Sequence, residues 1–403
     1  MATFFLVLIY MAFISLGLPD SVLGSAWPLM QSDFGVPLGT AGYIAMSIAA
    51  GTILSSLLSG PVIGRFGTGL VTMVSCMLTA AALLGYAHAP SVAWLFLFAV
   101  PLGLGAGAVD AGLNSYVAAH YKAHHMSWLH CFWGVGATLG PIILSWYIDH
   151  DASWRDGYST IAVIQWILVA VLLLSLPLWK RAASSHEADR ADRTEEGAEP
   201  LPLEGTDSEK PPAKQGILLA MLSFLFYCGV EASVGLWGSS FLVHVKQLPA
   251  STAAGWISLY YAGITVGRLV TGFVTFRVSS RTLIRAGQLT ALAGALLLLL
   301  PVPPVCSLIG LILVGLGCAP IFPCMLHETP ARFGRRHAPR IMGYQIAAAY
   351  TGSTVLPPLL GALAASFTIG IFPVLVLLYA LLMLIASERI NTLLKARLQG
   401  GHL

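Results

Sequence analysis

The sequence predicts an all-α membrane protein whose twelve transmembrane helices form two six-helix halves. Of its 403 residues, 57% are hydrophobic and only 10% are charged, and the mean hydropathy is +0.79. A soluble globule of this size could not carry that composition without aggregating. A helix needs about 20 mostly apolar residues to cross a bilayer, and the chain contains twelve segments of that kind. An internal repeat at an offset of about 212 residues divides them into two sets of six. The expected solvent is therefore the lipid bilayer.

The apolar segments give the expected spans in order. The first six lie near residues 4–28, 38–63, 68–87, 92–118, 127–148 and 158–179, and the second six near residues 216–243, 251–273, 282–301, 305–326, 341–364 and 368–387. The first segment starts without the basic region of a signal peptide and continues past Asp20 to Trp27, so we expect it to be a retained span.

An acidic, Pro-containing stretch poor in aromatic residues separates the two sets of spans. Such a composition cannot bury a core. We therefore expect an N-terminal half at residues 1–181, a cytoplasmic linker at residues 182–215 and a C-terminal half at residues 216–403.

The internal repeat predicts how the halves are related. Gly60, at the end of the second span, and Arg65, just after it, recur as Gly272 and Arg277 at the end of the eighth span and just after it, and the tripeptide GLG at 103–105 recurs at 315–317. Two parallel repeats with a substrate site near the midplane between them are a known plan of secondary transporters. We expect the halves to rock about that site, with the two loops as gating elements.

Basic residues set the expected orientation. With the N-terminus inside, eighteen of the twenty-one Lys and Arg residues fall on the cytoplasmic side. The positive-inside rule then places both termini and the linker in the cytoplasm, in a multi-pass protein of the plasma or inner membrane. The net charge of +3 is small and its bases are scattered over short loops, which excludes a nucleic-acid surface. We expect a monomer.

Three acids lie inside predicted spans, namely Asp20, Asp110 and Glu231. A carboxylate at the centre of a membrane helix costs about 2.5–3.5 kcal/mol, so each acid is a candidate for a function such as proton coupling. Glycines share a helical face with each acid and would leave volume for a solute. The alternative is that the glycines allow close helix packing and the acids only cross-link helices through hydrogen bonds.

Other polar and aromatic residues extend the candidate site. The expected substrate-binding residues are Asp20, Asn114, Trp27, His130, Trp133, Glu231, Trp237 and Gln345. His130 could equally be a structural residue, and interfacial anchoring would also explain several of the aromatic side chains. Arg268 lies near the cytoplasmic end of the eighth span, where we expect its long side chain to reach the membrane surface or to cap a gate.

Three motifs carry a resemblance to a known family. GPVIGRFGTG after the second span resembles the signature GxxxDRxGRR of the major facilitator superfamily, with Gly64 in place of the acid. GLPDSVLG and GLGAGAVDAGLNSYV resemble its fucose/galactose/glucose:proton symporter branch, although Asp110 stands where that branch has Glu. The resemblance implies a proton-coupled importer of a sugar or a related small polar metabolite. In that branch the acid on the fourth span, here Asp110, carries the proton, and the acid on the first span, here Asp20, contacts the substrate.

Alternative functions stay open from the sequence. Gly136, Gly140 and Pro141 resemble the antiporter signature of the fifth span, which favours an efflux exchanger of drugs or metabolites. A transporter-like receptor is a further class, and sodium could replace the proton as the coupling ion. The six cysteines form no CxxC pair, and neither a metal cluster nor a nucleophile with its base is visible. We therefore expect a protein that is not an enzyme and needs no cofactor.

Overall fold

The computed structural model describes residues 2–121, 123–195, 214–301, 303–334 and 337–400. Over these residues the regular elements are helices: α1 (Ala2–Phe34), α2 (Thr40–Phe66), α3 (Thr68–Ala87), α4 (Val92–His120), α5 (Ala123–Asp149), α6 (Trp154–Glu195), α7 (Lys214–His244), α8 (Ala250–Val274), α9 (Ser280–Leu299), α10 (Pro304–Phe333), α11 (Ala338–Ser366), the short 3-10 helix η1 (Ile369–Ile371) and α12 (Phe372–Gly400). Within this part of the chain, twelve helices are long and apolar enough to cross a membrane. The predicted fold class is confirmed.

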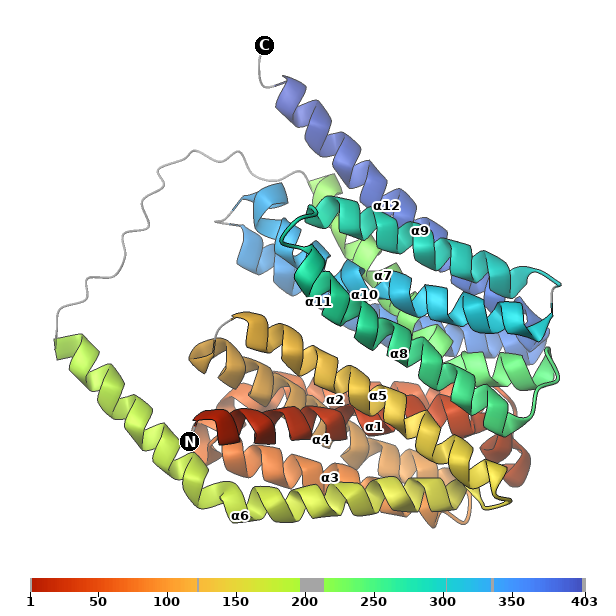
Figure 1. Ribbon diagram of the computed structural model, residues 1–403, viewed down its shortest axis with the longest axis horizontal. Helices are drawn as coiled ribbons and strands as arrows, with labels where there is room; N and C mark the ends of the chain where they lie inside the picture. The colour runs from red at the N-terminus through yellow and green to blue at the C-terminus, as the bar shows by residue number, and fades with distance from the viewer. Residues whose placement is uncertain (1, 122, 196–213, 302, 335–336, 401–403) are drawn as a thin grey trace.

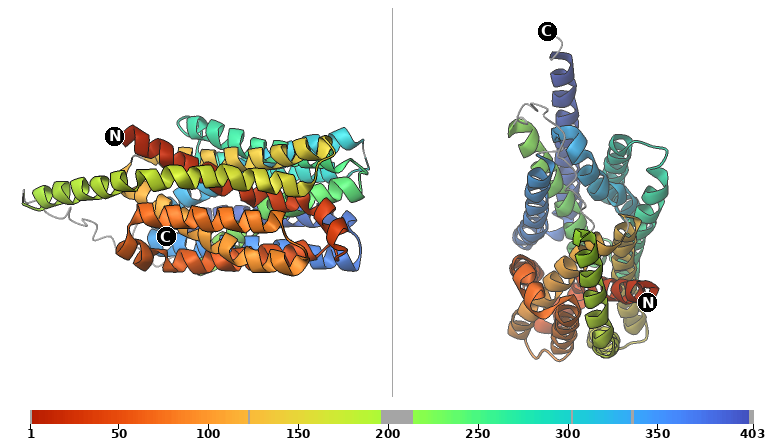
Figure 2. Two further views of the ribbon diagram at one scale, coloured as in Figure 1. Left: turned by 90° about the horizontal axis from the view of Figure 1, so that it is seen from below. Right: turned by 90° about the vertical axis from the view of Figure 1, so that its left-hand side faces the viewer.

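The helices gather into two bundles. Figure 1 shows α1–α6 in the lower bundle and α7–α12 in the upper one, and the end-on view in Figure 2 shows the same division. In the first bundle α1 packs on α5, and α4 packs on α2 and α3. In the second, α7 packs on α11 and α12, and α10 packs on α8 and α9. The bundles meet mainly through α5 with α8, α1 with α7, and α2 with α11, and α1 also contacts α8. We call this surface the central seam.

Helix contacts repeat between the bundles as the sequence repeat predicts. A Cβ atom on Gly103 would lie 2.1 Å from the carbonyl oxygen of Ile48, which brings the backbones of α4 and α2 together. A Cβ on Gly315 would lie 2.2 Å from the carbonyl oxygen of Tyr260, which does the same for α10 and α8. Both members of the second pair are 212 residues beyond their counterparts, since 315 − 103 and 260 − 48 are both 212. The two halves therefore reuse one close-packing solution based on small residues.

The bundles are joined at one end. We call the end with the connections 34–40, 149–154, 244–250 and 366–372 the loop end, and the opposite end, where α6 finishes and α7 begins, the linker end. Near the loop end the Ser145 hydroxyl on α5 donates 2.9 Å to the carbonyl of Ser251 on α8. A Cβ on Gly42 of α2 would lie 2.8 Å from Pro358 of α11. Figure 1 shows the bundles converging toward this end and separating toward the linker end.

Helices α6 and α7 flank the predicted linker. Helix α6 continues to Glu195, beyond the boundary predicted at residue 181, and α7 begins at Lys214. Linker residues 196–213 lie outside the described residues. The division into halves at 1–181, 182–215 and 216–403 stays a prediction.

Candidate functional site

The first part of the site is a carboxylate at the middle of α1. Asp20 lies 15 residues from the start of the candidate span Phe5–Phe34. Its flanking residue Ser21 is fully buried, and Leu18 is 2% exposed, but Asp20 itself is exposed. Asp20 therefore presents its carboxylate to an accessible space at mid-membrane depth instead of burying it among packed helices.

Trp133 of α5 holds this carboxylate. Its indole Nε1–H donates 2.8 Å to Oδ2 of Asp20. The contact follows from the packing of the two backbones, because a Cβ on Gly17 would lie 2.0 Å from the carbonyl oxygen of Trp133. The close-packing interpretation of the glycines therefore applies to Gly17. It also applies to Gly107, where a Cβ would lie 2.2 Å from the carbonyl of Thr52, so these two glycines leave no space for a solute.

Trp133 also reaches the second half of the protein. The guanidinium of Arg268 on α8 lies 5.3 Å from the centroid of the Trp133 ring, a cation–π contact across the central seam. The ring of Tyr261, also on α8, meets Trp133 edge-on with centroids 6.4 Å apart. Trp133 is thus where α1, α5 and α8 converge.

The second part of the site is an ion pair between α7 and α8. Arg268 Nη2 lies 3.4 Å from Oε1 of Glu231, and the two side chains are only 15% and 18% exposed. The Tyr227 hydroxyl donates to Oε2 of Glu231, and Arg268 Nη2 lies 3.5 Å from the same hydroxyl oxygen. Tyr260 donates 3.0 Å to the backbone carbonyl of Glu231. Every side-chain oxygen of Glu231 therefore has a partner.

This geometry corrects the expectation that Arg268 reaches the membrane surface, and its gating role stays a prediction. The sequence places it near a helix end and suggested that it extends to the membrane surface. In the structure α8 continues six residues beyond it to Val274, and the guanidinium turns inward to Glu231. The guanidinium thus has a carboxylate partner on the neighbouring helix instead of contact with bulk water.

The third part is a carboxylate and amide pair on α4. Asn114 Nδ2 lies 2.9 Å from both Oδ1 and the backbone oxygen of Asp110, one helical turn away. The Asn114 Oδ1 atom is buried and has no hydrogen-bond partner among the described residues. Asp110 also interacts electrostatically with Asp20, so the two acids of the first half lie in one electrostatic neighbourhood.

His130 lies between these parts. Its ring meets Phe13 of α1 edge-on, with centroids 6.0 Å apart. It also interacts electrostatically with Arg268 of the second half. Direct contacts thus link Asp20, Trp133, Arg268 and Glu231, and His130 lies in the electrostatic neighbourhood of Arg268.

Three other predicted ligand residues lie in packed positions. Trp27 is fully buried and donates 3.0 Å to the carbonyl of Leu38. Trp237 is fully buried and donates a 2.8 Å hydrogen bond to the carbonyl of Pro357. Its ring occupies the space beside Gly361. Gln345 is 3% exposed and accepts a 2.9 Å hydrogen bond from the Thr329 hydroxyl. In this conformation their polar atoms serve the packing of helices, and a role in substrate binding stays a prediction.

The predicted gating residues of the two repeat loops are exposed. A Cβ on Gly60 or on Gly272 would find nothing within 4 Å. Arg65 covers the ring of Phe66 at 5.5 Å, and Arg277 is exposed. All four lie toward the linker end, and their gating role stays a prediction.

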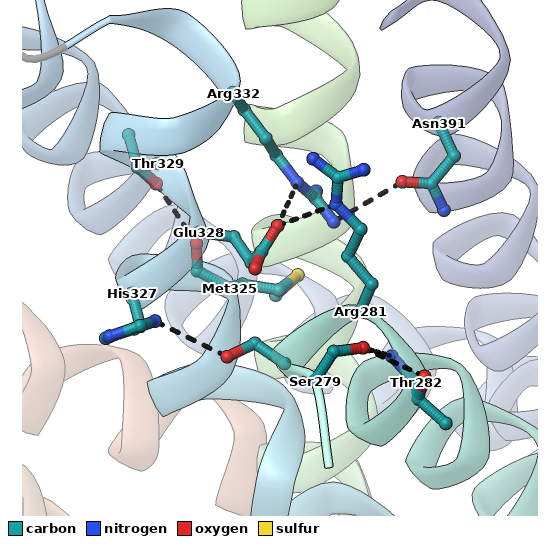
Figure 3. Close-up of polar contacts among 10 residues, drawn as sticks. Ser279, Arg281, Thr282, Met325, His327, Glu328, Thr329, Arg332 and Asn391 are labelled. Atoms are coloured by element: carbon teal, nitrogen blue, oxygen red, sulfur yellow. Dashed lines mark hydrogen bonds and ion pairs between the residues drawn. The ribbon is translucent and has the colours of Figure 1, made fainter. Parts of the chain in front are cut away.

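The sequence analysis missed a charged cluster at the linker end of the second half. Figure 3 shows Glu328 of α10 between two arginines and Asn391 of α12 facing Arg332. Glu328 Oε2 lies 2.9 Å from Arg281 Nε and 3.6 Å from Arg332 Nε, and Arg332 Nη2 lies 3.5 Å from the Asn391 amide oxygen. The i,i+4 spacing of Glu328 and Arg332 was the available signal. It was overlooked because the tenth span was expected to end at residue 326, whereas α10 continues to Phe333.

The site has the make-up of a transport pathway. Protonatable side chains lie within spans of both bundles, along the central seam, and the bundles contact each other near the loop end. Among the described residues no group of three or more His, Cys, Asp and Glu side chains could hold a metal ion. The fold defines a polytopic α-helical membrane protein of two bundles, and the site lies between them.

The chain belongs to the Major Facilitator Superfamily, whose sequence model matches residues 8–345. It is similar to the glucose/mannose transporter GlcP of Bacillus subtilis, with 25% identity over 66% of this chain and 65% of the relative. It is also similar to bypass of stop codon protein 6 of Saccharomyces cerevisiae, with 23% identity over 66% of this chain and 56% of the relative. The chain thus spans between about half and two thirds of the length of these curated relatives. Among solved structures, a D-xylose-proton symporter superposes with a TM-score of 0.73 at 12% identity, covering 96% of each chain.

The predicted family is confirmed. The relative GlcP and the structural neighbours are named as transporters, which agrees with the expectation that this protein is not an enzyme. The likeness to the symporter shows the shared fold. The relatives include carriers of sugars and of other metabolites.

Proposed function

We propose that this protein is a secondary carrier that couples proton movement to the uptake of a neutral sugar or a related small polar metabolite. The observation that carries the proposal is the Asp20 carboxylate, which is accessible at mid-membrane depth and held by the indole of Trp133. An ionised acid at this depth is costly. Binding a proton or accepting hydrogen bonds from a polyol each lowers that cost.

The surroundings of Asp20 suit a sugar. The indole donor engages Oδ2, so Oδ1 can accept a hydrogen bond from a substrate hydroxyl. The rings of Trp133 and Tyr261 supply aromatic surface beside the carboxylate, and the apolar face of a pyranose can pack on such a surface. The similarity to a glucose/mannose transporter supports this substrate class.

Asp110 is the proposed proton carrier. It lies on α4 beside Asn114, and among the described residues no Lys or Arg side chain forms an ion pair with it. Asp110 is half-buried, and its hydrogen-bond partner Asn114 is a neutral amide. Asp110 can therefore take up a proton without breaking an ion pair, whereas Glu231 is already paired with Arg268. Asp20 and Glu231 remain secondary candidates for coupling, and sodium remains the alternative ion.

Alternating access is the proposed transport cycle. The bundles contact each other through α5 and α8 near the loop end, and glycines such as Gly60 and Gly272 face open space toward the linker end. The distribution of Lys and Arg puts the linker end in the cytoplasm. With that orientation the conformation is inward-facing, in a plasma or inner membrane and with both termini inside. We propose that a monomer carries out the cycle.

Uptake by proteoliposomes tests the proposal. Purified protein in vesicles with an inward proton gradient should accumulate a labelled neutral sugar, from a panel that includes glucose, mannose, galactose and xylose. Collapsing the gradient with an ionophore should leave only equilibration. Equal accumulation with and without the gradient would exclude coupling, and uptake of none of the sugars would exclude the substrate class.

A proton-coupled efflux exchanger is the second candidate, because the α5 segment with Gly136, Gly140 and Pro141 packs directly on α1. A Cβ on Gly136 would lie 2.0 Å from the carbonyl of Ile14, and one on Gly140 would lie 2.6 Å from that of Leu18. This makes α5 a helix whose movement acts on Asp20. The direction of proton movement upon substrate addition distinguishes export from import. A transporter-like receptor would move neither protons nor substrate.

A further inference from the structure

The site contains a positive charge that is engaged by the protein itself. Arg268 lies beside Trp133, the residue that holds Asp20. An exposed guanidinium at this place would be a natural anchor for the carboxylate of an anionic substrate, because its planar fork matches carboxylate geometry. A carrier of neutral molecules does not need such an anchor next to its substrate.

The contacts of Glu231 keep Arg268 from being available to a substrate. The Glu231 carboxylate lies 3.4 Å from Arg268 Nη2, and the Tyr227 hydroxyl fixes its other oxygen. Tyr260 fixes the backbone of the same turn of α7. The face of the guanidinium is covered by the Trp133 ring. Arg268 is therefore occupied by a carboxylate that belongs to the chain and is held in place from three sides.

The charge balance of the site follows. Glu231 and Arg268 neutralise each other, while Asp20 and Asp110 contribute acidic groups that no arginine or lysine pairs with in the described structure. An anionic substrate would meet the Asp20 carboxylate, and like charges in a medium of low dielectric repel strongly. It would also have to displace Glu231 from a paired, hydrogen-bonded position.

We infer that Glu231 is a specificity determinant that masks Arg268 and thereby restricts the site to substrates without a negative charge. This inference rests on the proposed function and sharpens its substrate class to neutral sugars, with sugar acids excluded. Glu231 acts through Arg268, so it is a positioning residue. Its removal should change the selectivity between charged and neutral ligands, whereas loss of a merely structural contact would weaken both alike.

Binding of matched sugars to purified protein in detergent tests the inference. Glucuronate differs from glucose in having a carboxylate in place of the C6 hydroxymethyl group, and galacturonate is related to galactose in the same way. Wild-type protein should not bind either acid. Glu231→Gln should bind at least one of them, with the ratio of acid to neutral affinity raised roughly tenfold or more, the value of one charge-assisted hydrogen bond. Glu231→Asp, which keeps the charge, should restore the exclusion.

Two further variants serve as controls. The double variant Glu231→Gln with Arg268→Met removes both charges and should again exclude the acids. Glu388→Gln removes the acid of the exposed pair with Arg285, 3.3 Å apart at the linker end, and should leave selectivity unchanged. Binding of glucuronate or galacturonate by the wild type, or failure of Glu231→Gln to bind either, overturns the inference.

The reciprocal change covers the case in which Glu231→Gln cannot be recovered folded, since removing one partner of a buried ion pair is strongly destabilising. Arg268→Gln exposes Glu231, so the affinity for cationic glucosamine relative to glucose should rise by a similar factor. An unchanged ratio overturns the inference. Binding of glucose and galactose by the wild type is scored separately, and its absence counts against the proposed function. The gain of acid or amino-sugar binding by the variants is judged against the wild type alone.

Discussion

The indole N–H of Trp133 donates a 2.8 Å hydrogen bond to the Asp20 carboxylate, and the ring of the same residue makes a cation–π contact with Arg268 in the second half. One side chain thus touches the acid of α1 and the ion pair between α7 and α8. Any movement of α5 relative to α8 changes both contacts. This relation ties the state of Asp20 to the relative position of the halves.

Trp133→Phe tests the hydrogen bond. The variant keeps an aromatic ring for stacking but removes the donor that orients Asp20, so we expect sugar affinity to fall roughly fivefold, the value of about 1 kcal/mol. Trp146→Phe on the same helix, where the side chain is 56% exposed, should leave affinity unchanged. Titration calorimetry on purified protein measures both, and equal affinities for the two variants would remove Trp133 from the site.

A reversible cross-link tests the movement of the halves. A Cβ on Gly255 of α8 would lie 3.4 Å from Ser145 Oγ on α5, so a disulfide between Ser145→Cys and Gly255→Cys should form near the loop end. It should lock that end and stop uptake, because alternating access requires it to open. Reduction should restore uptake, and each single variant should be active. Undiminished uptake by the oxidised double variant would show that the loop end need not open.

A glycine at a close helix crossing tests the packing. Gly103→Ala places a Cβ 2.1 Å from the Ile48 carbonyl, so α4 and α2 must separate, at a cost of about 1–3 kcal/mol. Gly343→Ala on α11 places a Cβ in open space and should be neutral or slightly stabilising. Thermal unfolding in detergent should therefore show a lower midpoint for Gly103→Ala only. Similar midpoints would mean that the crossing tolerates separation.

Most of the fold could be predicted from the sequence because the signals are local. A run of about 20 apolar residues has to cross the membrane as a helix, whatever its neighbours are. The repeat of GLG at 103–105 and 315–317 indicated two related halves, and in the structure Gly103 and Gly315 make matching helix crossings. The ends of the helices were less certain, since α10 continues past residue 326 through a charged turn that hydropathy alone assigns to a loop.

The site could be predicted only in part. Helical spacing gives the face on which Asp20 lies, but it does not say which helix meets that face. The bond to Trp133, 113 residues away, therefore depends on tertiary packing that the sequence pattern does not encode. The same holds for Arg268, whose position near a helix end suggested the membrane surface until its partner Glu231 was located. Trp27 and Trp237 show the converse case, since aromatic residues on a promising face can be fully buried.

Asp110→Asn tests the proposed proton carrier. Asparagine resembles the protonated acid in shape and charge, so the carrier should still bind substrate and reorient, but a proton can no longer enter the cycle. We expect energy-independent counterflow close to that of the wild type and no accumulation under a proton gradient. Accumulation by this variant would move the coupling role to Asp20 or Glu231.

The most direct test of proton-coupled sugar uptake is a measurement of proton flux itself. Sugar is added to proteoliposomes in weakly buffered medium without a gradient, and the external pH is followed with an electrode. Symport predicts a transient alkalinisation with wild-type protein that is absent with Asp110→Asn and is abolished by an ionophore. No pH change on addition of a sugar that the vesicles demonstrably take up, or an acidification, would contradict the account.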